Sequence, residues 1–148
     1  MVTYALDTNI IIHYLRDEPN VIQNLENSVN NRNDIVIPRI VEYEIRRGFK
    51  VQPAPRKESH YDLLSRGTEF CSVVNMGDSF WRTAAQVYVD LYHKRFTVGD
   101  IDILIAAFCM YKGYTLVTNN TDDFKNIDGL KNVYDIWLKH KKHKSPHS

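Results

Sequence analysis

The sequence is poor in the residues that mark secreted, membrane-bound or thiolate-metal proteins. It contains two cysteines in 148 residues, Cys71 and Cys109, and both lie in apolar contexts without metal-ligand spacing. We expect them to be reduced core residues. The first residues lack the basic segment and cleavage site of a signal peptide, and no apolar run approaches the roughly 18 residues of a membrane span. These absences predict a cytoplasmic protein with no membrane segment.

Signals for several common enzyme classes are missing as well. The formal net charge is +1, so binding to nucleic acid must depend on local patches. The chain has no G-x-x-x-x-G-K-[ST], G-x-G-x-x-G or G-x-S-x-G motif, which leaves phosphate-binding loops and serine hydrolases without support. Its six histidines do not have the spacing of zinc ligands.

What is present is an alternation of strand-forming and helical segments. The predicted strands are Val2–Leu6, Ile35–Ile37, Cys71–Val74, Tyr114–Thr118 and, as a fifth, Leu130–Tyr134. The predicted helices are Thr8–Leu15, Pro19–Val29, a helix after Pro38 that ends at Arg47, Lys57–Phe70, Phe80–His93, Asp100–Tyr111, and a turn or short helix over Asn119–Phe124. The alternation predicts a single α/β domain over residues 1–138, in which helices cover both faces of a parallel sheet of four to five strands. Residues 139–148 are predicted to form a basic tail.

The first predicted strand ends abruptly at a carboxylate, Asp7, and a second apolar run follows at once. In open α/β sheets, ligands bind at the carboxyl ends of the strands. A buried carboxylate needs a partner there, because burying a bare charge costs several kcal/mol. We expect Thr8 or Asn9 to cap the helix that follows, which leaves Asp7 free for another task.

The helix after the second strand carries two acids, Glu42 and Glu44, whose spacing separates them. Glu44 lies within the apolar arc of that helix, so it is either paired with Arg47 or Arg39 or bound to a metal. Glu42 lies on the other side, near Arg46, and is predicted to be a solvated surface charge.

The helix from Asp100 is apolar on every side, which predicts that it is buried. Its charges before Lys112 are Asp100 and Asp102, both in the first turn. One acid suffices to cap the helix and to interact with its dipole, so a second acid suggests another role. A further acidic stretch, Thr118–Phe124, follows the fourth strand and should emerge at the same sheet edge as Asp7.

Four short segments occur in order: Leu6–Asn9, Glu44–Gly48, Asp102–Ala107, and Leu116–Asn120 with Phe124. Together they resemble the signature of PIN-domain ribonucleases, most closely that of the VapC-type toxins of prokaryotic toxin–antitoxin pairs. The resemblance implies a PIN-like three-layer α/β/α fold and a Mg²⁺- or Mn²⁺-dependent endoribonuclease, the toxin of a type II, VapBC-like pair. It also implies an RNA substrate, a homodimer, and a VapB-like antitoxin that blocks the active-site groove.

Carried over residue by residue, the resemblance implies that Asp7, Glu44 and Asp102 are the catalytic acids and metal ligands. Asn120 stands where many PIN domains have an aspartate, which bears on whether a second ion binds. Candidate helpers of the site are Asp100, Asn120, Asp123, Thr8 and Thr118. Mg²⁺ takes oxygen ligands and commonly uses one or two carboxylates, which this set provides.

Arg46 and Arg47, next to Glu44, are candidate contacts for RNA phosphates or for an acidic segment of an antitoxin. Two other functions stay open. A phosphatase of the haloacid dehalogenase type also ends its first strand in Asp, but it needs a second Asp two residues later, where this chain has Asn9. A PIN-like module that binds RNA or a partner without cleaving has Asn120 as its support.

Overall fold

The computed structural model describes residues 2–66 and 68–133, so the predicted basic tail lies outside the described residues. Its strands are β1 (Thr3–Leu6), β2 (Asp34–Pro38), β3 (Cys71–Val74), β4 (Thr115–Val117) and β5 (Asn132–Val133). Its helices are α1 (Thr8–Leu15), α2 (Pro19–Asn30), α3 (Arg39–Val51), α4 (Pro55–Arg66), α5 (Trp81–Lys94), α6 (Asp100–Lys112) and α7 (Thr121–Phe124).

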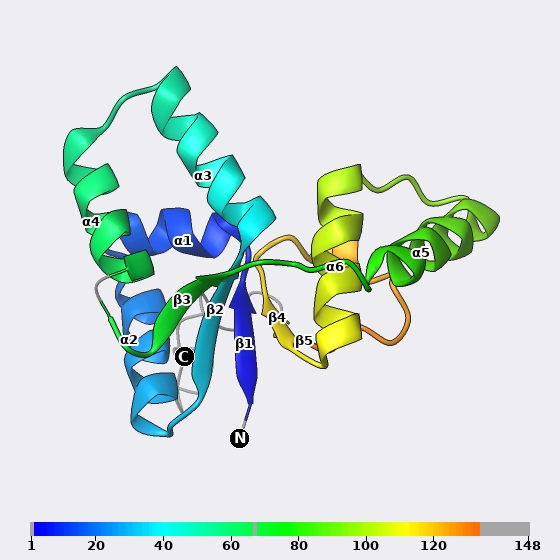
Figure 1. Cartoon of the computed structure of the whole chain (residues 1–148), viewed down its shortest axis with the longest axis horizontal. Helices are drawn as coiled ribbons and strands as arrows, with labels where there is room; N and C mark the ends of the chain where they lie inside the picture. Colours follow the sequence, from blue (N-terminus) through cyan, green and yellow to red (C-terminus); the bar gives the residue numbers. More distant parts are fainter. Residues whose placement is uncertain (1, 67, 134–148) are drawn as a thin grey trace, which may run out of the picture.

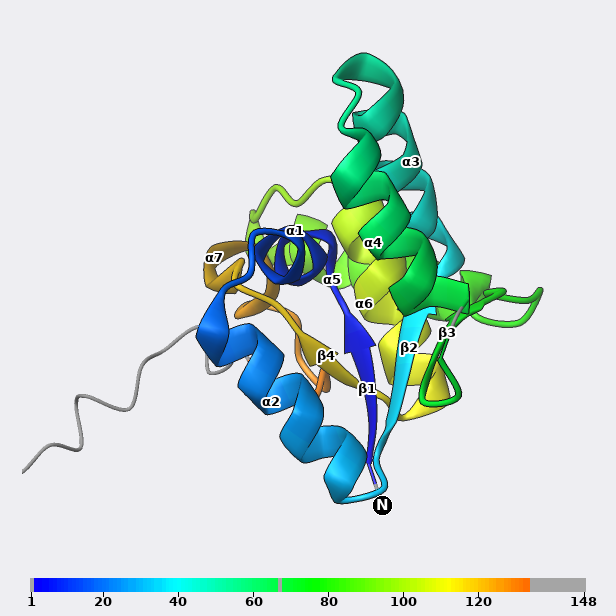
Figure 2. The same cartoon turned by 90° about the vertical axis from the view of Figure 1, so that its left-hand side faces the viewer.

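The strands form one parallel sheet in the order β3-β2-β1-β4-β5, with β1 at its centre. Helices α1 and α2 lie on one face of the sheet, and α5 and α6 lie on the other (Figures 1 and 2). The predicted three-layer α/β/α fold with four to five parallel strands is thus confirmed. Strands covered on both faces read as continuous apolar runs, as Ile35–Ile37 does here.

The hairpin of α3 and α4 extends past the carboxyl end of the strands, beyond the body of the sheet (Figure 1). The prediction that Gly48 ends α3 is wrong, because the helix continues to Val51. Gly48 is a helix-interior residue, and the cost of glycine there, about 1 kcal/mol relative to alanine, is too small to break a well-packed helix. In contrast, Gly113 has a φ of +72° and ends α6 as a left-handed cap, as its position predicts.

The packing of α6 explains its unusual composition. Five successive residues of the helix are fully buried, so every side of it faces the protein interior and carries apolar side chains: Ile105, Ala106, Ala107, Phe108 and Cys109. It lies against α5 and beside β4 (Figure 1). Among the described residues, no helix has both the length and the apolar character to cross a membrane.

Candidate active site

The first acid, Asp7, lies at the carboxyl end of the central strand and is 3% exposed. It also occupies the N-cap position of α1, where its carboxylate accepts a hydrogen bond of 2.8 Å from the Thr8 backbone N–H. The prediction that Thr8 or Asn9 caps this helix is therefore wrong. Asp7 is the single residue between the end of β1 at Leu6 and the start of α1 at Thr8, so the capping position falls on Asp7 itself.

Two side chains hold the other oxygen of Asp7. The Thr118 hydroxyl donates to it at 2.7 Å, and the Asn9 amide donates at 3.2 Å. The sheet register explains the first contact, because Leu6 pairs with Val117 and the residues that follow them emerge side by side. Asn9 also accepts a 2.9 Å bond from the Asn119 backbone N–H and so ties the β1 and β4 ends together. Sequence reasoning missed this role of Asn9, although its place two residues after the acid was a signal.

The pKa of Asp7 is raised above its ordinary value. Burial is the main cause, and the negative charge of Glu44 adds to it. Hydrogen bonds from Thr118, Thr8 and Asn9 act in the opposite direction but do not cancel the effect of burial. Asp7 is therefore a buried acid whose ionised form lacks a compensating positive charge.

The second acid, Glu44, comes from α3 and is half-buried. The Thr8 hydroxyl donates a 2.6 Å hydrogen bond to its Oε1, which joins Glu44 to the residue next to Asp7. Arg47, half-exposed one turn further along α3, lies 3.6 Å from Oε2. Of the two alternatives from the sequence, the pairing with Arg47 is observed, and metal binding by Glu44 stays a prediction.

The third acid, Asp102, lies in the first turn of α6 and is half-buried. Its pKa is raised to about 7, mainly by burial, and also by a hydrogen bond with Asp123 and by the negative charges of Asp7, Asp123 and Glu44. These effects show that the predicted acids lie close enough to repel one another. Asp123 is in turn held by the Asn120 amide, which donates to its Oδ2 at 2.8 Å.

Not every predicted helper joins this cluster. Asp100 is exposed at the start of α6 and, in the part of the chain that the structure describes, forms no hydrogen bond or ion pair. Thr8, Thr118 and Asp123 each contact one of the three acids, and Asn120 joins the cluster through its hydrogen bond to Asp123. The structure therefore brings together the three predicted acids and four of the five helpers.

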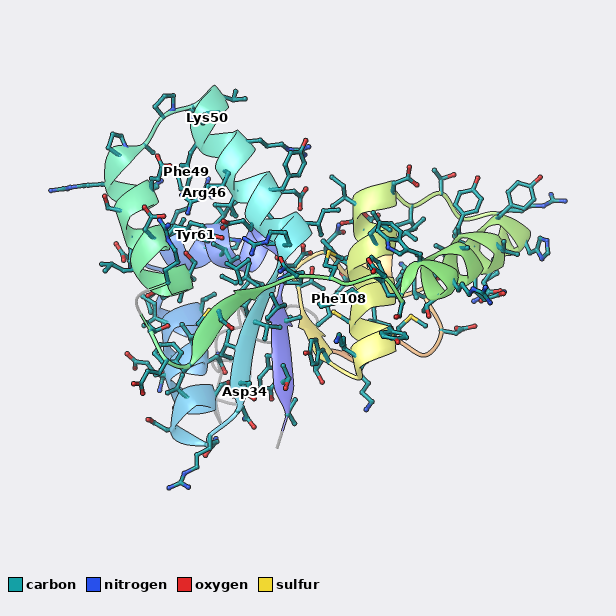
Figure 3. All side chains as sticks on the ribbon, viewed as in Figure 1. Asp34, Arg46, Phe49, Lys50, Tyr61 and Phe108 are labelled. Carbon is teal, nitrogen blue, oxygen red and sulfur yellow. The ribbon has the colours of Figure 1, made fainter. Side chains whose placement is uncertain are left out.

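Glu42 differs from its prediction, and Arg46 is held by ion pairs within the α3–α4 hairpin. Glu42 is not a solvated charge: it accepts a short hydrogen bond from the buried Tyr61 hydroxyl and lies 3.6 Å from Arg46. Arg46 also pairs with Asp62 at 2.6 Å and with Glu58 at 3.4 Å, and its guanidinium lies over the Tyr61 ring. Figure 3 shows Arg46 and Tyr61 between α3 and α4. These contacts occupy Arg46, whereas Arg47 remains at the edge of the acidic site.

The oxygen-only donor set suits a hard divalent cation. Within the described residues, no three His, Cys, Asp or Glu side chains form a ready-made metal-binding group. Mg²⁺ does not require one, since it keeps several waters and commonly uses one or two carboxylates. Asp7 and Asp102 are acids with raised pKa values and neighbouring negative charges, so a bound cation would stabilise their ionised forms.

Comparisons with known proteins agree with the fold. The PIN domain family model matches residues 4–130. Ribonuclease VapC2 of Rickettsia felis is 28% identical over 92% of this chain and 98% of that protein. The tRNA(fMet)-specific endonuclease VapC of Shigella flexneri is 24% identical over 88% of this chain and 96% of that protein. In the crystal structure of VapBC2 from R. felis bound to a promoter DNA fragment, a chain with 27% identity superposes with a TM-score of 0.80 over 90% of this chain and 98% of its own length.

Proposed function

The chain belongs to the PIN-domain family, and on that premise we propose that it is a metal-dependent endoribonuclease, the toxin of a VapBC-type toxin–antitoxin pair. Its relatives are named as ribonucleases or endonucleases, and these names agree with the function predicted from the sequence. The observation that carries the proposal is the meeting of Asp7, Glu44 and Asp102 at the carboxyl edge of the sheet. Acids that repel one another in this way suit a site for a cation and a phosphodiester.

Asp7 and Asp102 would hold Mg²⁺ or Mn²⁺, with Glu44 acting directly or through water. When bound, the ion would lower the pKa of a water molecule and offset negative charge on the phosphate oxygens. Thr118 and Asn9 orient the Asp7 carboxylate, and Thr8 orients Glu44, so the acids are positioned before any substrate arrives.

Asn120, which replaces an aspartate of many PIN domains, would favour a module that binds without cleaving only if no other carboxylate took the place of that aspartate. Its amide donates to Asp123, and Asp123 is hydrogen-bonded to Asp102. The pair Asn120 and Asp123 therefore supplies a carboxylate on the side of the site where the acid is missing from the sequence. This arrangement supports cleavage rather than simple binding.

Partners are the second part of the proposal. Structural neighbours of this chain are VapBC complexes from R. felis and other bacteria, which supports a VapB-like antitoxin as the partner. We infer that Arg47, half-exposed beside Glu44, contacts the antitoxin or the RNA. We also infer a homodimer, supported by an exposed aromatic face on α5 that carries Trp81, Tyr88 and Tyr92.

The proposal can be tested with purified protein and a mixture of transfer and ribosomal RNA, with Mg²⁺ or with EDTA. We expect cleavage that requires the metal and that falls by about 100-fold or more in Asp7→Asn and Asp102→Asn. Asp122→Asn is the matched control, because Asp122 is exposed, lies beside Asp123 and pairs with Lys125 at the surface. Cleavage that survives in EDTA or in either site variant would contradict the assignment, and binding without cleavage would favour the non-catalytic module.

A further inference from the structure

A pocket of about 340 Å³ lies between α1, α3 and the loop that joins α3 to α4. We propose that this pocket is a subsite for the nucleotide next to the scissile phosphate, in which Gln52 contacts the edge of the base. The inference rests on the ribonuclease function proposed above and adds a specificity-determining residue to it.

The pocket is continuous with the candidate active site. Thr8 and Glu44, which are joined by a 2.6 Å hydrogen bond, line one end of it. A phosphodiester held at Asp7 and Asp102 would therefore place one neighbouring nucleotide over this opening. Neither the pocket beside Tyr14 nor the pocket beside Tyr88 is lined by any of the three acids.

The interior of the pocket suits a flat, mostly apolar group. Leu15 of α1 and Ile45 of α3 are buried in its floor, and Ile12 and Phe49 add further apolar surface. A volume of about 340 Å³ lies at the lower end of the range for small-molecule sites. One nucleotide fits a pocket of this kind, whereas an amphipathic helix needs a groove with anchors over several turns.

Polar groups are few and lie at the rim. Gln52, the C-terminal cap of α3, is exposed, and in the part of the chain described here its side chain makes no hydrogen bond. An amide carries both donors and an acceptor, which is what recognition of a base edge requires. Gln52 thus offers an unoccupied donor and acceptor for a base edge, beside an apolar floor that accepts any base.

The charge at the rim favours RNA. Arg16 and Lys57 are exposed on opposite sides of the pocket, and neither forms an ion pair among the described residues. Arg46, by contrast, is held by Glu42, Glu58 and Asp62 and is not available. Two free cations beside an apolar pocket complement the phosphates that flank a bound base.

Gly48 provides a way to fill the pocket without disturbing the fold. It lines the pocket from the middle of α3, and a Cβ built there would meet nothing within 4 Å. Leucine at this position would therefore project into open space at the pocket, and leucine is a better helix former than glycine. Ser59→Leu, at an exposed position of α4, is the control for adding an apolar side chain to this hairpin.

The first test maps the 5′ ends of the fragments that each variant produces from the RNA mixture. We expect wild-type cleavage sites to share a base preference next to the cut, and Gln52→Ala to lose it. Gly48→Leu should cleave at least 10-fold more slowly, while Ser59→Leu cleaves like wild type. Unchanged rate and unchanged sites in Gly48→Leu would overturn the proposal, as would a base preference that survives Gln52→Ala.

The second test does not depend on cleavage. The four nucleoside 5′-monophosphates are added to Asp7→Asn protein, and backbone amide signals of Gly48 and Gln52 are followed by NMR, with inorganic phosphate as the control. We expect at least one nucleotide, but not phosphate, to shift these signals, and Gly48→Leu to abolish the shift. Shifts of these NMR signals without RNA cleavage by the wild type would contradict the proposed function but keep the nucleotide site. Cleavage by the wild type without any shift would keep the proposed function and contradict the nucleotide site. If Gly48→Leu impairs only binding of a co-expressed antitoxin, the pocket is a protein site and the nucleotide proposal is wrong.

Discussion

At the scale of the residue, the site is defined by acids whose charges are not balanced. Burial raises the pKa of both Asp7 and Asp102, and each acid also feels the negative charge of Glu44. Neighbouring donors from Thr118 and Thr8 only partly offset this for Asp7. Without a cation, a pKa of about 7 means that Asp102 is protonated up to about neutral pH. The proton then neutralises a negative charge that a bound metal ion would otherwise offset.

Asp102→Asn should remove a pH dependence from the stability of the metal-free protein. The pKa of Asp102 is about 7 in the folded state and 3.8 ordinarily, so the folded state holds more protons between these values. Stability therefore falls as pH rises from about 4 to about 7. One pKa unit corresponds to about 1.4 kcal/mol, and after discounting for partial exposure we expect the variant to be about 1–2 kcal/mol more stable than wild type at pH 8.

This can be measured by urea denaturation in EDTA at pH 4 and pH 8. The gain should be small at pH 4, because the wild-type carboxyl is protonated in the folded state there and only partly ionised in the unfolded state, so the two states bind similar numbers of protons. Asp122→Asn is the control, since Asp122 is an exposed aspartate that pairs with Lys125 at the surface. A gain of the same size at both pH values would mean that the titration of Asp102 is not its cause.

The acids that meet at the candidate site could be singled out in the sequence because each leaves a local sign there. Asp7 follows directly after an apolar strand, Glu44 lies in an apolar helical arc, and Asp102 is a charged residue in the first turn of a helix that is otherwise apolar. The contacts that position them were less predictable. The bond from Thr118 to Asp7 spans 111 residues, and it depends on sheet register, which periodicity alone does not reveal.

At the scale of the element, α3 shows where sequence periodicity is insufficient. Helical spacing separates Glu42 from Glu44 correctly but does not say what each side faces. The outer side of α3 is covered by α4, whose Tyr61 is fully buried and donates to Glu42. A residue expected in solvent thus lies in an interface between helices, because α4 packs beside α3 (Figure 3).

Tyr61→Phe should destabilise the protein by about 1–2 kcal/mol, because the half-buried Glu42 carboxylate loses its hydroxyl donor. Tyr43→Phe is the matched control. Tyr43 lies on α3, the helix that carries Glu42, is 53% exposed, and has its hydroxyl 3.4 Å from Arg47. That change should cost less than about 0.5 kcal/mol. Chemical denaturation of the two variants provides the comparison, and equal losses would show that the Tyr61–Glu42 bond does not stabilise the hairpin.

At the scale of the whole molecule, the layer order was predictable from the alternation of strands and helices. The surface that the molecule presents to another copy was not. Helical spacing groups Trp81 and Tyr88 with Ala84, Val87 and Leu91 as one apolar face of α5, yet Trp81 and Tyr88 are 54% exposed, while the other three are buried. Both stripes of α5 are apolar, so helical spacing cannot say which of them meets the sheet.

The exposed stripe is an expected interface. Trp81, Tyr88 and Tyr92 recur at helical spacing, and the rings of Tyr88 and Tyr92 stack at 6.4 Å. Aromatic residues are enriched at protein interfaces, and a contiguous exposed apolar patch on a soluble domain marks an interaction site. Helix α5 and the α3–α4 hairpin lie at opposite ends of the molecule in Figure 1. Pairing through α5 would therefore leave the α3–α4 hairpin, which carries Glu44, away from the interface.

We accordingly expect the wild-type protein to be a dimer at micromolar concentration and Tyr88→Glu to be a monomer, as measured by size-exclusion chromatography with light scattering. A charge at the centre of an apolar interface would be desolvated without a partner, which costs several kcal/mol. Tyr111→Glu is the control, because Tyr111 is 49% exposed on α6 rather than on the α5 stripe. A dimer that persists in Tyr88→Glu would place the interface elsewhere, and loss of the dimer in both variants would point to general destabilisation. Because none of Asp7, Glu44 and Asp102 lies on α5, the monomeric variant should keep these acids in place and bind Mg²⁺ as wild type does.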